Sequence, residues 1–96
     1  MANENLKDKV RGDITDMIVE LFGVSKQDVK EESNFQKDFG ADSLDGVEFI
    51  MKLEEKYNIG IPDDDAEKMT NVGKVVDYVT KKVKGKYWTI VKDKIL

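Results

Sequence analysis

Apolar residues recur every three or four positions over residues 6–22, and this spacing constrains the fold more than any other feature of the chain. Residues spaced in this way share one face of an α-helix, so the segment predicts an amphipathic helix with a buried stripe. Gly23 is a suitable C-terminal stop, whereas Gly12 inside the helix costs about 1 kcal/mol relative to alanine. The stripe consists of Leu6, Val10, Ile14, Met17, Ile18, Leu21 and Phe22.

The connection over residues 23–42 is long for a compact domain, and it carries four apolar side chains. A loop of this length without structure would be unusual. We therefore expect Val24, Val29, Phe35 and Phe39 to hold the connection against the rest of the protein.

Helical patterns also dominate the second half of the chain. A long helix is expected from about Ser43 to Tyr57, with an apolar side made of Leu44, Val47, Ile50, Met51, Leu53 and Tyr57. Pro62 interrupts the pattern, and the acidic segment after it predicts a short helix capped by Asp63. Thr70 or Asn71 then caps a last long helix. Its buried stripe is Val72, Val75, Val76, Val79 and Val83.

These patterns together predict the fold class. No strand alternation is found before residue 86. The expected fold is therefore all-α: a four-helix bundle with three long helices and one short helix, plus a C-terminal extension.

The composition excludes several classes of function. The chain has 96 residues, enough for one domain with a modest core, and contains no cysteine and no histidine. It therefore has no thiolate metal site and lacks the commonest general base, so we expect no catalytic and no metal-ligating residue. Neither a membrane span nor a signal peptide is recognisable, and a cytoplasmic location is the simplest expectation.

The charge is distributed unevenly. The net charge of −4 combines −1 over residues 1–30, −9 over residues 31–67 and +6 over residues 68–96. An acidic middle segment suits a basic protein partner and argues against nucleic acid as a ligand.

The stretch GADSLDG, residues 40–46, places Ser43 between two aspartates. A nucleophile elbow would need a glycine where Asp45 stands, together with a base that the chain lacks. A calcium loop starting at Asp63 would need a glycine and a glutamate where lysines stand. On spacing alone, Asp42-Ser43 is a helix N-cap. A helix start also tolerates a phosphate, so Ser43 can carry a phosphodiester.

The segment FGADSLDGVEFIMKLEEKYNIGIPDDDAEKMTNVGKVVDYV resembles the acyl carrier proteins, in its D-S-L motif and in its later IPDDDAEK. The resemblance covers roughly residues 5–84. It implies that a magnesium-dependent phosphopantetheinyl transferase attaches 4′-phosphopantetheine from coenzyme A to Ser43. The chain would then be a non-catalytic carrier, expected to be monomeric. It would present growing or finished acyl chains as thioesters to the enzymes of a dissociated fatty-acid synthase.

The resemblance also implies two groups of residues. The docking face for basic surfaces of processing enzymes comprises Asp42, Leu44, Asp45, Val47, Glu48, Met51, Glu54 and Ile61. Charge speeds the encounter, and a small apolar area keeps release fast. The interior that takes up the acyl chain comprises Phe35, Ile50, Leu53, Ile61, Ala66, Met69, Val75 and Tyr78, each of which is equally an ordinary core residue.

Two departures from the family pattern leave the pathway open. Gly46 stands where the family usually has a larger residue, and the chain continues past the usual end. A specialised carrier for polyketide, lipid A or aminoacyl transfer is therefore the alternative. A third possibility is a structural interaction subunit that never carries the arm.

We expect the chain to comprise an acyl carrier domain, residues 1–85, and a C-terminal extension, residues 86–96. Gly85 permits the chain to turn before the extension. Trp88, Val91 and Ile95 fall at helical spacing, although their β-branched neighbours also favour an extended form. We expect the extension to pack on the bundle, because an exposed tryptophan would be adhesive. The alternatives are a disordered terminus and a lid or extra docking element.

Overall fold

The computed structural model describes the backbone of residues 2–95 and the side chains of residues 6–86. Helices account for the regular structure of this part of the chain, as expected. They are α1 (Ala2–Phe22), the 3₁₀ turn η1 (Lys26–Asp28), α2 (Phe35–Phe39), α3 (Ser43–Tyr57), α4 (Asp63–Lys68) and α5 (Val72–Ile95). None of the described helices is long and apolar enough to span a bilayer.

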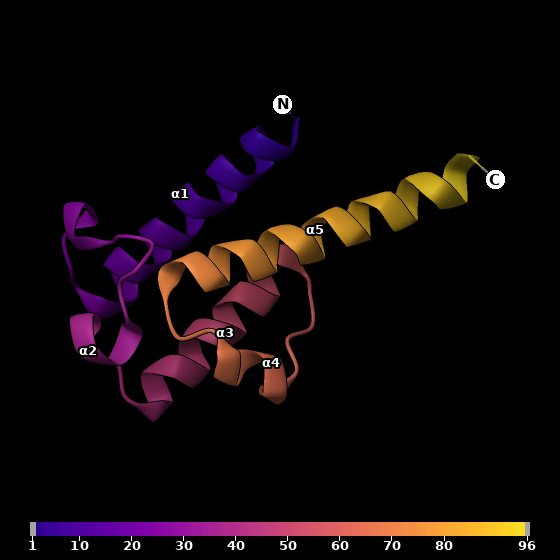
Figure 1. Ribbon diagram of the computed structural model, residues 1–96. Helices are drawn as coiled ribbons and strands as arrows, with labels where there is room; N and C mark the ends of the chain where they lie inside the picture. Colours follow the sequence, from indigo (N-terminus) through magenta and orange to yellow (C-terminus); the bar gives the residue numbers. More distant parts are fainter. Residues whose placement is uncertain (1, 96) are drawn as a thin grey trace.

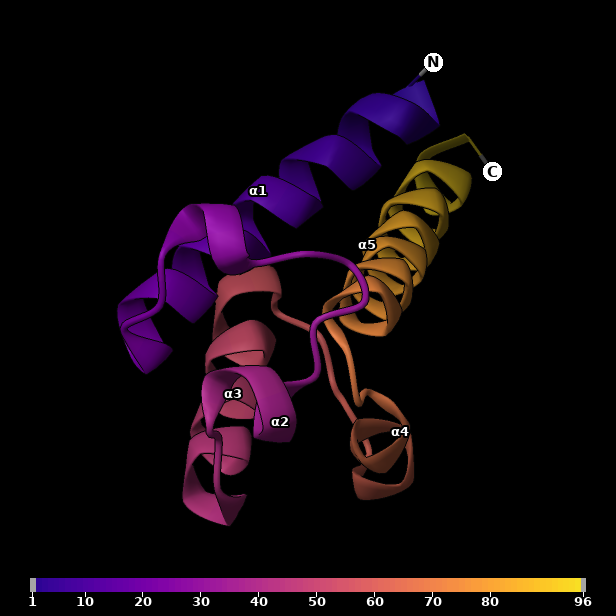
Figure 2. The same ribbon diagram turned by 60° about the vertical axis from the view of Figure 1, so that its left-hand side comes forward.

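The three long helices surround the core. In both views, the free ends of α1 and α5 lie at one end of the molecule, while α4 and the first turn of α3 lie at the other (Figures 1 and 2). The first turn of α3 is therefore remote from the free ends of α1 and α5.

The predicted stripes of α1 and α5 form most of the core. In α1, Val10, Ile14 and Ile18 are at most 1% exposed. The helix ends at Phe22 because Gly23 adopts a left-handed φ of 68°. The other four predicted α1 residues are half-buried against this core: Leu6, Met17, Leu21 and Phe22. From α5 come the buried Val72, Val75, Val76 and Val79, with Val83 packed against them.

The connection between α1 and α3 contains two short helical elements that the sequence did not predict. The Asn34 side chain accepts hydrogen bonds from the N–H groups of Gln36 and Lys37, both at 2.9 Å, and so caps α2. The carboxylate of Asp38 accepts one in return from the Asn34 N–H at 2.6 Å. These bonds stabilise a helix too short to form alone. Phe39 is buried, and Val24, Val29 and Phe35 pack against the core, as expected.

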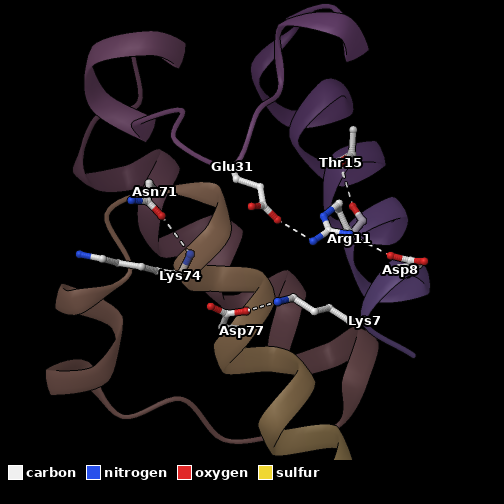
Figure 3. Close-up of polar contacts among 8 residues, drawn as sticks. All are labelled: Lys7, Asp8, Arg11, Thr15, Glu31, Asn71, Lys74 and Asp77. Atoms are coloured by element: carbon white, nitrogen blue, oxygen red, sulfur yellow. Dashed lines mark hydrogen bonds and ion pairs between the residues drawn. The ribbon is translucent and has the colours of Figure 1, made fainter. Parts of the chain in front are cut away.

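The caps of the last two helices correct one expectation and decide another. Asp63 does not cap α4: the N-cap is Pro62, whose carbonyl oxygen accepts from the N–H groups of Asp65 and Ala66 at 3.0 Å. Proline can serve as the N-cap because this position needs an extended backbone and a carbonyl acceptor, and proline supplies both. Asn71, rather than Thr70, caps α5, because its Oδ1 accepts from the Lys74 N–H at 2.9 Å (Figure 3).

A close approach ties the connection to the start of α5. The Gly73 N–H donates to the Glu31 carbonyl oxygen at 2.9 Å, and a Cβ at Gly73 would lie only 3.3 Å from that oxygen. The Glu31 carboxylate also pairs with Arg11, which binds Asp8 on the same helix at 2.9 Å (Figure 3). Residue 31 therefore joins α1 to α5.

Helix α5 continues through Gly85 without the turn that the sequence permitted. Glycine weakens a helix but does not end it when the residues on both sides keep helical dihedrals. The expected packing of Trp88, Val91 and Ile95 concerns side chains outside those that the structure describes, and it stays a prediction.

Candidate functional site

Ser43 is the first residue of α3, and the two aspartates beside it fix the start of this helix. Asp42 is the N-cap, and its Oδ1 accepts from the Asp45 N–H at 2.9 Å. The Asp45 carboxylate accepts in return from the Asp42 N–H at 3.1 Å. This is a capping box, so both acids have a structural role in addition to their charge. Ser43 itself is exposed, and within the described part of the chain no hydrogen bond engages its hydroxyl.

The turn before Ser43 is held by α2. Gly40 ends α2 in a left-handed conformation, with φ of 66°, which glycine adopts without steric cost. The Ala41 N–H then donates to the Phe35 carbonyl oxygen at 3.0 Å. Because Phe39 and Ala41 are both buried, the chain is fixed on either side of the glycine.

A cavity of about 630 Å³ lies beside Ser43, between α2, α3, α4 and the start of α5. Six of the eight residues expected in the acyl pocket line it: Phe35, Ile50, Ile61, Ala66, Met69 and Val75. The other two are not among the lining residues. Leu53 is fully buried within the core, and Tyr78 points its hydroxyl to a carboxylate on α4.

Further lining residues that the sequence did not assign to the site include the apolar Phe22, Ala41, Gly46 and Phe49. The aromatic ones belong to a cluster with Phe35 and Phe39, in which the paired ring centroids lie 5.1 to 6.2 Å apart. Rings at this spacing stabilise one another beyond the area they bury. The four-residue spacing from Phe49 to Leu53 was the available signal, but Phe49 was omitted from the expected stripe.

Five of the eight residues expected on the docking face lie on an exposed side of α3 and its cap. Leu44 is 79% exposed, and Val47 and Met51 are each 57% exposed. Asp42 and Glu48 are exposed beside them, while Asp45 is half-buried. Apolar side chains exposed to this degree, and surrounded by acids, are typical of a protein-binding surface.

Ile61 and Glu54 hold the segment before α4 rather than extend that exposed side. Ile61 is only 6% exposed and lines the cavity, so its expected docking role is not matched by accessible surface. The half-buried Glu54 accepts a hydrogen bond from the Ile61 N–H at 3.0 Å. This bond explains both positions, because it draws the segment inward onto α3.

Two tyrosine hydroxyls join the helices around the site. Tyr78 on α5 donates to Asp65 Oδ2 on α4 at 2.7 Å. Burial and then this hydrogen bond raise the pKa of Tyr78 to about 12. Tyr57 at the end of α3 donates to Asp13 on α1 at 3.2 Å, and burial, followed by the Asp13 charge, raises its pKa further. Both contacts therefore favour the neutral phenol, because only the protonated hydroxyl can donate to a carboxylate.

The acids of α3 and α4 have no cationic partners. Among the described side chains, ion pairs engage the acids Asp8, Asp13, Glu31 and Asp77, all outside these two helices. Acidic side chains that are not neutralised internally leave a negative surface, which attracts a basic partner.

The comparisons with known proteins fit this geometry. Residues 12–79 match the family described as "Phosphopantetheine attachment site". The acyl carrier protein of Chloroherpeton thalassium is 49% identical over 77 residues, 80% of this chain and 96% of that protein. That of Wolinella succinogenes is 57% identical over 67 residues, 70% of this chain and 88% of that protein.

A solved structure matches as well. It is the acyl carrier protein from Enterococcus faecalis, a structure described as having novel components that contribute to high thermal stability. It is 32% identical, with a TM-score of 0.71, over 79% of this chain and 96% of that one.

Proposed function

The chain belongs to the acyl carrier protein family, and on this premise we propose that Ser43 bears the phosphopantetheine arm of a carrier for a dissociated fatty-acid synthase. Growing or finished acyl chains would be its cargo, held as thioesters. One observation carries the proposal: the exposed Ser43 hydroxyl opens α3 at the edge of a largely apolar cavity. The residues matched to the phosphopantetheine family include this serine.

The surroundings of Ser43 suit a phosphate-linked group. The first N–H groups of a helix have no acceptor within the helix, and they lie at the positive end of its dipole. The capping box uses the Asp45 N–H, which leaves those of Ser43 and Leu44 without a helical partner. When bound, the group supplies a thiol that carries the acyl chain, and the chain has no cysteine to compete with it.

The exposed side of α3 supports docking to the basic surfaces of a phosphopantetheinyl transferase and of acyl-processing enzymes. Leu44, Val47 and Met51 would provide the apolar centre of the interface, and Asp42 and Glu48 its charged edge. Such an interface is small, and charge mainly raises the association rate. A carrier that visits several enzymes needs this combination of fast encounter and fast release.

Other parts of the proposal follow from the carrier role. The chain serves as a protein-bound substrate and performs no catalysis itself. It works as a monomer in the cytoplasm, with residues 1–85 as the carrier domain and residues 86–96 as an extension.

A specialised carrier for polyketide, lipid A or aminoacyl transfer is the second candidate. Gly46 favours it, because this residue lines the cavity beside Ser43 and contributes no side chain. The absence of a side chain leaves the cavity wider beside Ser43 than a larger residue would, and a wider cavity suits bulkier acyl groups.

The test is the intact mass after incubation with coenzyme A and a broad-specificity phosphopantetheinyl transferase. Wild-type protein should gain one arm, and Ser43→Ala should gain none. Ser43→Ala should also fold normally, because Asp42 rather than Ser43 is the N-cap. Ser25→Ala is the matched control, since Ser25 also precedes a helical turn and its side chain makes no capping bond.

The outcomes separate the candidate functions. An arm on Ser43→Ala would overturn the attachment site. Wild-type protein that never gains an arm would support a structural interaction subunit instead. Enzymatic loading of the arm with straight, branched and aminoacyl groups would then separate the fatty-acid carrier from the specialised one.

A further inference from the structure

Toward the core, the cavity beside Ser43 ends at three side chains, one from each long helix. Its lining includes Phe22 of α1, Phe49 of α3 and Val75 of α5. Phe49 is 3% exposed, Val75 is also buried, and the half-buried Phe22 packs against the same core. We call these three side chains the end layer.

The core behind the end layer is closed to the cavity. Four positions from each residue of the end layer, on the same face of its helix, lies a residue that is 0% exposed and does not line the cavity. These residues are Ile18, Leu53 and Val79. In all three helices this step leads away from the end of the molecule that carries the first turn of α3 (Figures 1 and 2). The cavity therefore stops between two successive layers of the core.

Phe49 is the residue of the end layer that the other rings hold most closely. Along α3 the lining begins at Ser43 and Gly46, where a Cβ would meet no atom within 4 Å. One turn later, the centroid of the Phe49 ring lies 5.1 Å from that of Phe35 and 6.2 Å from that of Phe22. Rings at these distances attract one another, which holds Phe49 in front of Leu53. The space along α3 thus changes from open to closed within one turn.

The other borders of the cavity are polar. Gln36, Asp63, Glu67 and Thr70 line it and are exposed. The half-buried carboxylate of Glu54 accepts the Ile61 N–H at 3.0 Å on the side of α4. An alkyl chain loses contact with water only where apolar groups replace it. The apolar path from Ser43 therefore leads to the end layer.

We propose that Phe49 sets the longest acyl chain that the cavity encloses. This inference rests on the proposed carrier function and names the residue that selects its cargo by length. Each methylene that enters the cavity leaves water and stabilises the loaded protein. Once the chain reaches the end layer, the next methylene stays in water or displaces a packed ring, and displacing a side chain in a close-packed core is unfavourable.

A series of loaded proteins measures this limit. A phosphopantetheinyl transferase loads the full-length chain from acyl coenzyme A, with saturated chains from butyryl to palmitoyl, and the intact mass verifies each product. The melting temperature should rise with each longer chain and then level off, because further methylenes remain in water. The chain length at this break is the limit.

Two variants should move the break in opposite directions. Phe49→Leu should move it to chains about two carbons longer, because in a close-packed core the volume removed becomes available to the cargo. Val75→Ile adds a methyl group to the end layer and should move the break to shorter chains, which provides a test even if Phe49→Leu folds poorly. Leu53→Val is the matched control. It also removes volume from the buried side of α3, but behind Phe49, so it should lower all melting temperatures and leave the break in place.

A second way of loading separates this inference from the carrier function. Because the chain has no cysteine, Ser43→Cys introduces a single thiol, to which alkyl methanethiosulfonates attach saturated chains of graded length. If the transferase adds no arm, but these alkylated proteins show a break that Phe49→Leu moves, the carrier function fails and the limit set by Phe49 stands.

Three outcomes would overturn the inference under either way of loading. One is a break at the same chain length in the unsubstituted end layer, in Phe49→Leu and in Val75→Ile. Another is an equal displacement of the break in Phe49→Leu and Leu53→Val, which would indicate general loosening of the core. The third is the absence of a break, with a melting temperature that either ignores chain length or rises through palmitoyl.

Discussion

Gly46 affects both the stability of α3 and the shape of the cavity, and replacing it by alanine tests the two effects. It lies inside α3, where glycine is less favourable than alanine by about 1 kcal/mol, and it lines the cavity beside Ser43. A Cβ built at this position meets no atom within 4 Å. The substitution therefore introduces no clash.

Replacing Gly46 by alanine should raise the free energy of unfolding by about 0.5–1 kcal/mol, as measured by urea denaturation. Gly12→Ala is the control: Gly12 is also helical and has equal space, but it lies away from the cavity. Both variants should gain stability, and only Gly46→Ala should alter the rates of arm loading and acyl transfer. Equal rates in both variants would show that Gly46 has no role at the opening.

The tyrosines predict how stability changes at alkaline pH. The pKa of Tyr78 is raised from 10.0 to about 12, and that of Tyr57 is raised in the same direction. The folded state therefore holds the phenolic protons more tightly than the unfolded chain does. Their contribution to stability is complete below pH 10 and is lost as the pH rises from 10 toward 12.

The variant Tyr57→Phe/Tyr78→Phe should have a flatter decline of the unfolding free energy across this range, measured by chemical denaturation at each pH. It should also be less stable near neutral pH by about 1 kcal/mol for each hydrogen bond lost. A decline as steep as that of the wild type would mean that other groups, such as lysines, govern the alkaline transition.

At the scale of elements, α3 carries two apolar stripes, and this decides how much the sequence could predict. Its ends, Ser43 and Tyr57, were predicted correctly. The expected single apolar side, however, combined the buried Leu53 with the exposed Leu44 and Met51. Spacing cannot distinguish a stripe that faces the core from one reserved for partners, because both recur every three or four residues.

The short elements were harder to predict for a different reason. Helix α2 has five residues, too few to leave a periodic pattern, and it depends on the reciprocal bonds between Asn34 and the residues after it. The cavity next to it requires the α2, α3 and α4 segments to come together. The expected lining rested on family positions: six of those residues line the cavity, Leu53 and Tyr78 do not, and Ala41 and Phe49 were missed.

The two stripes of α3 should respond differently to truncation. Phe49 is 3% exposed, so Phe49→Ala should lower the free energy of unfolding by about 3–5 kcal/mol through the cavity it leaves. Met51 is exposed, so Met51→Ala should change the free energy of unfolding by less than about 0.5 kcal/mol. The same substitution should slow arm loading and acyl transfer by partner enzymes. Urea denaturation and arm-loading kinetics measure the two effects. A large loss of stability in Met51→Ala would contradict the inference that the exposed stripe of α3 does not pack against the core.

At the scale of the whole molecule, charges of opposite sign are separated along the chain. Residues 31–67 carry a net charge of −9, and residues 68–96 carry +6. The acidic part includes α3 and α4, whose acids have no cationic partner among the described side chains. The ion pairs that do form among the described side chains all involve a residue of α1, such as Lys7, which pairs with Asp77 of α5 at 2.9 Å (Figure 3).

Added salt should therefore raise the melting temperature. Salt weakens the few exposed ion pairs, each worth less than about 1 kcal/mol, but it also screens the repulsion among the acids of α3 and α4. Screening reduces the range of that repulsion to about 10 Å at 0.1 M salt, and we expect this effect to be the larger one. Magnesium should act more steeply than sodium at equal ionic strength, because a divalent cation is drawn more strongly to a dense negative surface.

Thermal melts followed by circular dichroism, in sodium chloride and in magnesium chloride, measure this difference. The variant Glu55→Gln/Asp64→Asn removes two exposed acids from α3 and α4. It should melt higher than the wild type at low salt and respond less to either cation. If the wild-type melting temperature were indifferent to both salts, the acids of α3 and α4 would have to be neutralised in solution by Lys52 and Lys56 on α3. Removing the two acids would in that case lower the melting temperature, so the sign of the variant's shift decides between repulsion and compensation.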